Sequence, residues 1–318
     1  MSSMSFDLPS RTRFAPTRTT LRCCALFALA AGLCTFASAQ ATAAPAASTA
    51  SAPTSVPPMN GIAHIAIRVK DIPASVAFYH KLGFDQAFAN MGRDNTTITQ
   101  SFLKLNDRQY IELYPVAAQT PQVEFLHLCF EGADLNAIHD YYVAEGLTPI
   151  SVRTAGAGNL LFTMKGPQQF ADPQNIEYTQ YMPGSKHTVD FGQHLGPDRV
   201  GDKMAVVALA MQDPAAARTF YLTKLGFTPS KTGAARLDLP GTSGESVEIV
   251  PVSELGSRSS IVLTSPDLDK AAAQLTRQQV EFKRASASAT DAGGKTHTVD
   301  MISVSDPDGN IIRIQSAK

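Results

Sequence analysis

The sequence predicts an α+β protein assembled from four copies of one βαβββ module. Three observations support this. The segment GIAHIAIRVKDIPASVAFYHKLGF at 61–84 returns as a close paraphrase, KMAVVALAMQDPAAARTFYLTKLGF, at 203–227. Each copy joins an alternating apolar run to an Asp that can cap a helix and to a Leu-Gly-Phe ending. Two further segments, beginning EFLHLCF and SSIVLTS, follow the same order, so the unit recurs roughly every 55–70 residues.

The first module begins with a strand at 62–69, IAHIAIRV, whose alternation places His64 on the face opposite Ile65, Ile67 and Val69. Asp71 is expected to cap a helix with an apolar stripe at helical spacing, and Gly83 to end it. Three strand-like runs complete the module, at 84–89, 97–105 and 109–115.

The other modules follow the same plan. In the second, a strand at 124–130 precedes a helix capped by Asp134 and ending near Gly146. Its short strands are expected near 149–153, 159–165 and 176–181. The third module spans 203–252. The fourth runs from SSIVLTS through a helix capped by Asp267 to DPDGNIIRIQ.

Four such modules in tandem resemble the vicinal oxygen chelate (VOC) superfamily, which includes glyoxalase I, fosfomycin-resistance proteins, methylmalonyl-CoA epimerase and extradiol dioxygenases. The resemblance covers residues 60–318 and is most specific in HIAIRVKDIPASVAFYHKLGF, YIELYP, DPQNIEY and DPDGNIIRI. It implies that the modules pair into two half-barrel domains shaped like cups. It also implies metal ligands on the first and last strands of each module.

The chain is expected to start with an export signal. Four arginines precede the apolar run CCALFALAAGLCTFASA, which ends in a small-residue cleavage site at Ala37–Ala39. We therefore expect a secreted or periplasmic protein with no membrane association after cleavage. The predicted organisation is a signal peptide at 1–39, a flexible linker at 40–58, a metal-binding VOC domain at 59–183, an interdomain segment at 184–200 and a second VOC domain at 201–318.

The composition indicates which classes of partner the protein can have. The formal charge is −1 and no basic block is present, which argues against a nucleic-acid partner. Three of the four cysteines lie in the predicted signal peptide, so the exported chain would carry only Cys129 and no internal disulfide. We expect a small-molecule substrate and a monomer or homodimer.

The resemblance assigns four metal ligands in the first two modules: His64, Glu112, His127 and Glu177. The spacing is matched, since 48 residues separate His64 from Glu112 and 50 separate His127 from Glu177. Two imidazoles and two carboxylates suit one divalent ion of zinc, nickel, manganese, cobalt or iron(II). The equivalent positions of the second pair hold Val206, Glu248, Ser260 and Arg313, so this half is expected to have lost the metal.

The alternation of side chains along the strands adds further residues to the candidate site. Side chains that share a face with the ligands are expected to contact substrate. They are Arg68, Tyr110, Tyr114, Thr179 and Tyr181. Arg68 could bind a substrate carboxylate.

Three functions follow from the resemblance. The first is a lyase or isomerase of the glyoxalase/epimerase type, in which the metal chelates adjacent oxygens and stabilises an enediolate while Glu112 or Glu177 moves protons. The second is an Fe(II) extradiol ring-cleaving dioxygenase, which needs two His and one carboxylate. The third is a non-catalytic small-molecule binding protein. The two-glutamate quartet favours the first.

Overall fold

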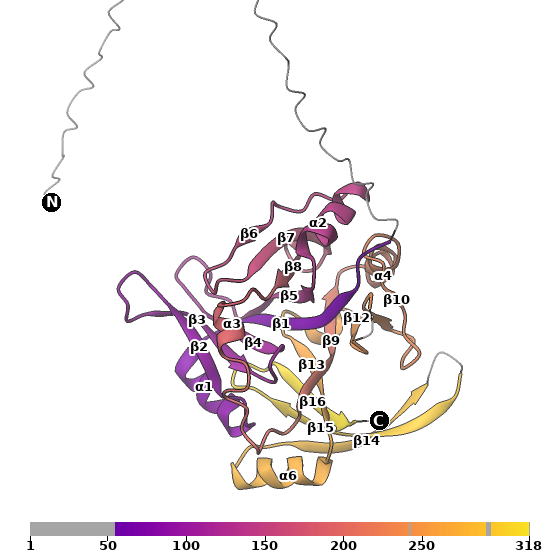
Figure 1. Ribbon diagram of the computed structural model, residues 1–318. Helices are drawn as coiled ribbons and strands as arrows, with labels where there is room; N and C mark the ends of the chain where they lie inside the picture. The colour runs from indigo at the N-terminus through magenta and orange to yellow at the C-terminus, as the bar shows by residue number, and fades with distance from the viewer. Residues whose placement is uncertain (1–54, 242, 291–293, 318) are drawn as a thin grey trace, which may run out of the picture. The chain divides into compact units, whose positions relative to one another are not determined.

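The computed structural model describes residues 55–241, 243–290 and 294–317. The predicted signal peptide and most of the predicted linker lie outside the described residues. Two eight-stranded mixed sheets make up the described chain (Figure 1). The α+β class and the repeated modules are thus confirmed.

The first two modules form one sheet with strand order β2-β3-β4-β1-β5-β8-β7-β6, here called the first half. Its elements are β1 (Met59–Val69), α1 (Ile72–Lys81), β2 (Gln86–Met91), β3 (Ile98–Lys104), β4 (Tyr110–Pro115), β5 (Glu124–Gly132), α2 (Leu135–Ala144), β6 (Arg153–Thr154), β7 (Leu160–Gln168) and β8 (Pro173–Gln180). Of the strand expected at 149–153, only Arg153 lies in a strand, the two-residue β6. Pro149 lacks an N–H, which weakens pairing there.

The last two modules form the second half in the same order, β10-β11-β12-β9-β13-β16-β15-β14. A short helix, α3 (Lys186–Val189), precedes it. Its elements are β9 (Lys203–Met211), α4 (Pro214–Thr223), β10 (Thr228–Pro229), β11 (Arg236–Asp238), β12 (Ser246–Pro251), α5 (Val252–Leu255), β13 (Ser260–Ser265), α6 (Leu268–Arg277), β14 (Lys283–Thr290), β15 (Thr296–Ser305) and β16 (Ile311–Ser316).

Strand pairing explains how the modules join. Within a module the first and last strands are parallel neighbours, as in β1 with β4 and β5 with β8. Between modules the two first strands pair antiparallel, β1 with β5 and β9 with β13. The strands β4, β1, β5 and β8 are therefore consecutive in the middle of the first sheet. These four strands carry the predicted ligands.

The helix caps repeat with the modules. The side chains of Asp71, Asp134 and Asp213 each accept a hydrogen bond of 3.0 Å from the backbone N–H three residues later, and Asp267 accepts one of 2.9 Å from Lys270. This satisfies a helix N–H that has no partner inside the helix. The caps predicted at Asp71, Asp134 and Asp267 are confirmed.

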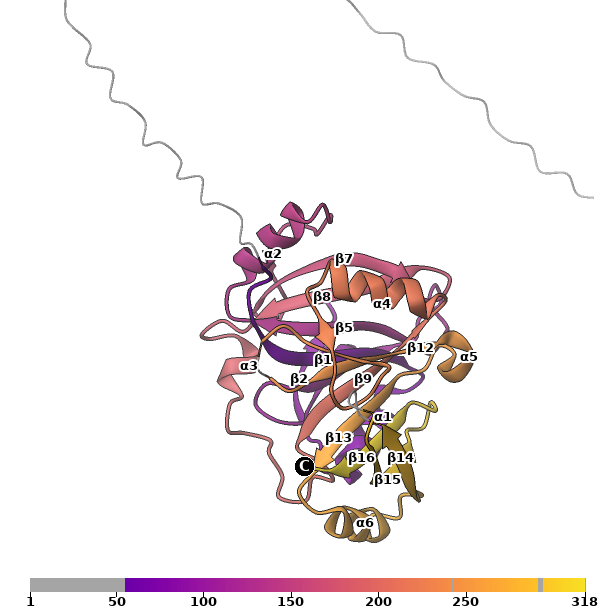
Figure 2. The same ribbon diagram turned by 90° about the vertical axis from the view of Figure 1, so that its right-hand side faces the viewer.

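The two halves share one hydrophobic core. The ring centroids of Phe130 in β5 and Phe227 after α4 lie 5.5 Å apart. Helix α4 packs against both β7 and β12, where Figure 2 shows it beside the first sheet. Buried hydrogen bonds add to this joint, since Tyr79 of α1 donates to Asp306 (3.1 Å) and Gln174 of β8 donates to Tyr221 of α4 (2.8 Å).

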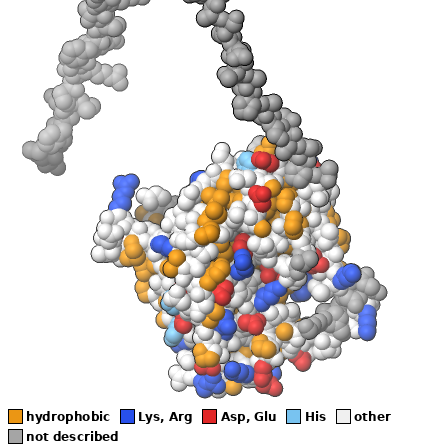
Figure 3. All heavy atoms as spheres, viewed as in Figure 1, with side chains coloured by type: hydrophobic (Ala, Val, Ile, Leu, Met, Phe, Trp, Pro, Cys, Tyr) orange, Lys and Arg blue, Asp and Glu red, His pale blue; other side chains and the backbone are white. Residues whose placement is uncertain are grey.

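Charges of both signs are interspersed on the face shown in Figure 3. Within the described ranges, every helix is too short or too polar to cross a membrane.

Candidate metal centre

Strand register places the four predicted ligands in two neighbouring rows. Ala66 of β1 lies between Glu112 of β4 and His127 of β5. Cys129 of β5 lies between His64 of β1 and Glu177 of β8. Each row thus holds one His and one Glu around a small residue, which leaves room above the strands for the longer side chains to meet.

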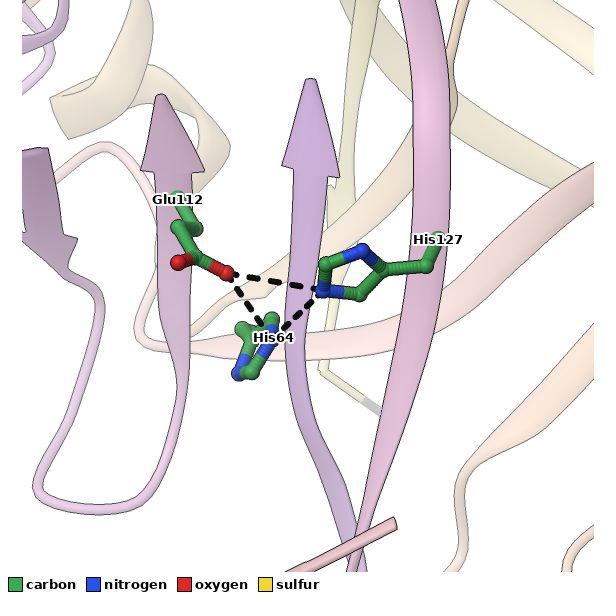
Figure 4. A group of neighbouring side chains, drawn as sticks. All are labelled: His64, Glu112 and His127. Carbon is green, nitrogen blue, oxygen red and sulfur yellow. Dashed lines mark hydrogen bonds and ion pairs between the residues drawn. The ribbon is translucent and has the colours of Figure 1, made fainter. Parts of the chain in front are cut away.

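The four polar ends converge on one point (Figure 4 shows three of them). The Nε2 atoms of His64 and His127 are 3.1 Å apart. Glu112 Oε2 lies 3.1 Å from the first ring and 3.5 Å from the second. Glu177 Oε1 lies 3.4 Å and 3.9 Å from the same two nitrogens.

These groups are buried and electrostatically coupled. His64 is 4% exposed and Glu112 is 3% exposed. Burial raises the pKa of Glu112, but His64 and His127 outweigh burial and hold the pKa below its usual value. The pKa of Glu177 is lowered in the same way, against the effect of burial. Burial lowers the pKa of His64, but Cys129 and Glu112 outweigh it and raise the pKa well above its usual value.

The donor set fits a divalent ion. Ligand atoms that share one ion at about 2.1 Å lie roughly 3–3.5 Å from each other, and the separations around His64 fall in that range. Two carboxylates balance the charge of such an ion, and imidazole with carboxylate suits borderline and hard metals. In the described part of the chain, the groups able to hold a metal are His64 with Glu112 and His127, and His64 with Cys129 and Glu177. Both lie in the first half.

The two glutamates differ in how they are held. Glu112 Oε1 accepts a 2.9 Å hydrogen bond from Gln100 Nε2, and Gln100 also donates to Tyr114. No amide or hydroxyl donor within the described residues holds Glu177. Its contacts are with the two rings and the thiol of Cys129. Glu112 is thus held by an amide donor in addition to the rings, whereas among the described residues Glu177 has no such donor.

A cavity of about 180 Å³ opens over the centre. Besides His64, Glu112, Glu177 and Tyr114, its lining includes polar side chains that the sequence analysis did not select. These are Asn90, Gln100, Arg153, Asn159 and His187. They come from β2, β3, β6, the loop before β7 and helix α3, none of which carries a predicted ligand.

His187 is the least expected of them, because it lies in the predicted interdomain segment. It is 2% exposed, and neither ring nitrogen has a hydrogen-bond partner among the residues that the structure describes. It stacks on Tyr181 at 4.4 Å between centroids and meets Tyr110 edge-on at 5.0 Å. Burial, and then the charge of His64, lower the pKa of His187 to about 3, so the ring is neutral.

The predicted substrate residues are distributed unevenly. Tyr114 lines the cavity. Tyr110 and Tyr181 instead flank His187, and Thr179 accepts a hydrogen bond from Asn159. Arg68 is outside the cavity lining, and its guanidinium is paired with Glu124. The register between β1 and β5 shifts between Ala66 and Ile67, so Arg68 lies beyond the regular pairing that aligns the ligands, and opposite Glu124.

Comparisons with known proteins agree with this architecture. The profile of the Glyoxalase/Bleomycin resistance protein/Dioxygenase superfamily matches residues 61–178 and again 203–314. A search of curated protein sequences found no significant match.

Solved structures with the same fold include two kinds of enzyme. The Mn(II)-bound glyoxalase from Novosphingobium aromaticivorans has a TM-score of 0.59 at 15% identity, over 81% of this chain and 82% of that one. An extradiol ring-cleaving dioxygenase from B. fuscum has a TM-score of 0.58 at 13% identity, over 84% and 74%. The 2,3-dioxygenase LapB from Pseudomonas sp. KL28 has a TM-score of 0.57 at 12% identity, over 83% and 94%.

Proposed function

Because the chain belongs to the Glyoxalase/Bleomycin resistance protein/Dioxygenase superfamily, we propose that its first half is a metal-dependent lyase or isomerase. Its substrate class is a small, oxygen-rich carbonyl compound from which a proton next to the carbonyl is removed. The observation that carries the proposal is the convergence of two histidines with two carboxylates, of which only Glu112 accepts a hydrogen bond from an amide of the described residues.

His64, Glu112, His127 and Glu177 would hold the divalent ion. The ion, when bound, supplies Lewis acidity that polarises a carbonyl oxygen and makes the neighbouring C–H more acidic.

Glu177 is the proposed general base. A general base must lie within reach of the proton that it removes, and Glu177 lines the cavity. Among the described residues, no amide or hydroxyl group donates a hydrogen bond to Glu177. Glu112 keeps its position because Gln100 donates to its second oxygen. The two carboxylates therefore have different roles, although they occupy equivalent strands.

Other lining residues orient the substrate. Arg153 is exposed at the cavity and can bind a carboxylate in bidentate form. His187 is neutral, so it offers one N–H donor and one acceptor to a substrate hydroxyl. Asn159 and Asn90 add amide groups to the same wall.

Solvent deuterium exchange tests the proposal. Mature protein is loaded with Mn(II) or Ni(II), and a panel of α-hydroxycarbonyl compounds and 2-oxo acids is followed by NMR in deuterium oxide. We expect metal-dependent deuterium incorporation next to the carbonyl of at least one compound. Glu177→Gln should lower that rate about 100-fold or more while retaining metal. Exchange that is independent of metal, or unchanged in Glu177→Gln, would contradict the proposal.

A ring-cleaving dioxygenase is the second candidate. The observation that favours it is His187, a neutral acid–base group facing the cavity over a centre that contains two His and a carboxylate. Oxygen uptake by Fe(II)-loaded protein with a panel of catechols tests it. Uptake that is lost in His187→Phe would favour this function over the first.

We also propose that the protein is exported, on the signal-peptide pattern of residues 1–39. N-terminal sequencing of the protein from its native host tests this, with cleavage after Ala39 expected.

A further inference from the structure

The second half has a counterpart of the metal centre in which the ligand positions hold other residues. Register places Ala208 of β9 between Glu248 and Ser260, as Ala66 lies between Glu112 and His127. Val262 lies between Val206 and Arg313 in the same way that Cys129 lies between His64 and Glu177. The replacements are therefore structurally equivalent, residue for residue.

A cavity of about 300 Å³ is present at this place. Its lining is Arg236, Glu248, Val262, Met301, Arg313 and Gln315. Four of the equivalent sheet positions, held by Phe102, Glu112, Leu161 and Glu177, line the first cavity. In the strand register Arg236 lies beside Glu248, as Phe102 lies beside Glu112 in the first half. Likewise, Met301 lies beside Gln315, as Leu161 lies beside Thr179. The second half has thus kept the cavity while changing its chemistry.

The new lining is cationic. Two arginines face one glutamate, and the closest approach of Arg236 Nε to Glu248 Oε1 is 3.8 Å. Arg313 is half-buried and makes no hydrogen bond or ion pair with the described residues. Holding a partly buried guanidinium without a counter-charge is unfavourable, and a carboxylate is its best bidentate partner.

The rest of the cavity limits the ligand further. Val262 and Met301 offer an apolar surface. Glu248 and Gln315 offer hydrogen-bond groups near the arginines. Val206 cannot ligate a metal, and Arg313 would repel one, so the site selects a negative organic group in place of a cation.

We propose that the second half binds a small organic carboxylate. Arg313 holds its carboxylate, Glu248 and Gln315 hydrogen-bond a polar substituent, and Val262 with Met301 packs against its carbon skeleton. This site is separate from the metal centre and does not depend on the function proposed for the first half.

Calorimetric titration of the full-length mature protein tests the proposal. The probes are lactate and benzoate, their neutral amides lactamide and benzamide, and inorganic phosphate. We expect at least one carboxylate to bind and its amide to bind at least tenfold more weakly. Arg313→Gln should weaken carboxylate binding about 10- to 100-fold, the usual effect of losing a charged hydrogen-bond partner. Arg313→Lys should lie between the two.

Two control variants separate this site from other cationic groups. Arg93→Gln changes an exposed arginine outside both cavities, and Arg153→Gln changes the arginine of the first cavity. Neither should alter binding at Arg313. The methyl resonance of ¹³C-labelled Met301, assigned with Met301→Leu, should shift on titration in the wild type and in both controls but not in Arg313→Gln.

The proposal would be overturned by the absence of binding by every carboxylate or by equal binding of acid and amide. It would also be overturned by a Met301 shift that survives Arg313→Gln while thermal unfolding shows that variant to be folded. Binding of phosphate alone would also overturn it, because the site would then recognise an inorganic anion.

Discussion

At the scale of single residues, the metal centre is expected to depend most strongly on its two histidines. His64 and His127 supply both nitrogen donors. We expect His64→Ala and His127→Ala each to lower metal affinity by two orders of magnitude or more, since changes at residues that only support ligands already cost about 10- to 100-fold. Elemental analysis and competition with a chelator measure this.

The matched control for this prediction is Glu248→Gln, at the position in the second half that corresponds to Glu112. It should leave metal content unchanged. Equal loss of metal in this variant and in His64→Ala would mean that the ion is bound elsewhere.

A second residue-scale prediction concerns Glu245, which joins the two halves. It accepts a hydrogen bond from the backbone of Ile62 and lies 3.4 Å from Lys203 Nζ. Burial raises its pKa from 4.5 to about 7, although Ile62 and Lys203 act in the opposite direction. Between these two values the folded protein holds a proton that the unfolded chain has lost, so raising the pH favours unfolding.

We therefore expect Glu245 to contribute a loss of stability on the order of 2 kcal/mol between about pH 4.5 and pH 7. Glu245→Gln keeps an acceptor for Ile62 and should remove this part of the pH dependence. Urea unfolding at several pH values measures it. Glu254→Gln, at an exposed position, is the control and should match the wild type; an unchanged slope in Glu245→Gln would refute the assignment.

At the scale of elements, the end of each module helix has its own conformational requirement. After α1, α2 and α4, Gly83, Gly146 and Gly226 take φ values of 87°, 79° and 72°. The equivalent residue after α6 is Gln279, at φ 54°. A side chain is strained in this left-handed region, whereas glycine is not.

Gln279→Gly should therefore stabilise the protein by about 0.5–1 kcal/mol, after allowance for the greater freedom of glycine in the unfolded chain. The reciprocal variant is Gly146→Gln, where an added Cβ would meet no atom within 4 Å, so only backbone strain opposes it. That variant should be destabilised by about 1 kcal/mol. Chemical denaturation measures both, and a shift of the same sign in both variants would contradict the explanation.

The elements also show why part of the site was predictable. First and last strands repeat with their module, so the family resemblance, supported by the matched spacing, selected His64, Glu112, His127 and Glu177, and register brings them together. His187 belongs to α3, which lies outside the repeats, and only tertiary packing on Tyr181 places it at the cavity. Parity along β1 suggested Arg68 as well, but a charge partner on β5 was not visible in the sequence.

At the scale of the whole molecule, two cavities of opposite chemistry lie on one duplicated framework. The first is lined by two carboxylates, two imidazoles and one arginine, and the second by two arginines and one carboxylate. The shared core preserves the framework, because positions such as Phe130 and Phe227 pack across the halves and tolerate little change. The cavity-facing positions are free of that constraint.

Because the core is continuous, we expect the two halves to unfold in one transition. Binding of a metal ion to the first half should therefore stabilise both halves. At a free metal concentration of about 100 times Kd the gain is about 2.7 kcal/mol. For a domain of this size that corresponds to a rise in Tm of roughly 5–10 °C. His64→Ala should abolish the rise.

The chain has no Trp, so peptide-resolved hydrogen exchange during heating is the suitable probe of unfolding in each half. Peptides from β5 and from β13 should lose protection at the same temperature, with and without metal. Melting of β13 at an unshifted, lower temperature while β5 is stabilised would show that the halves are independent.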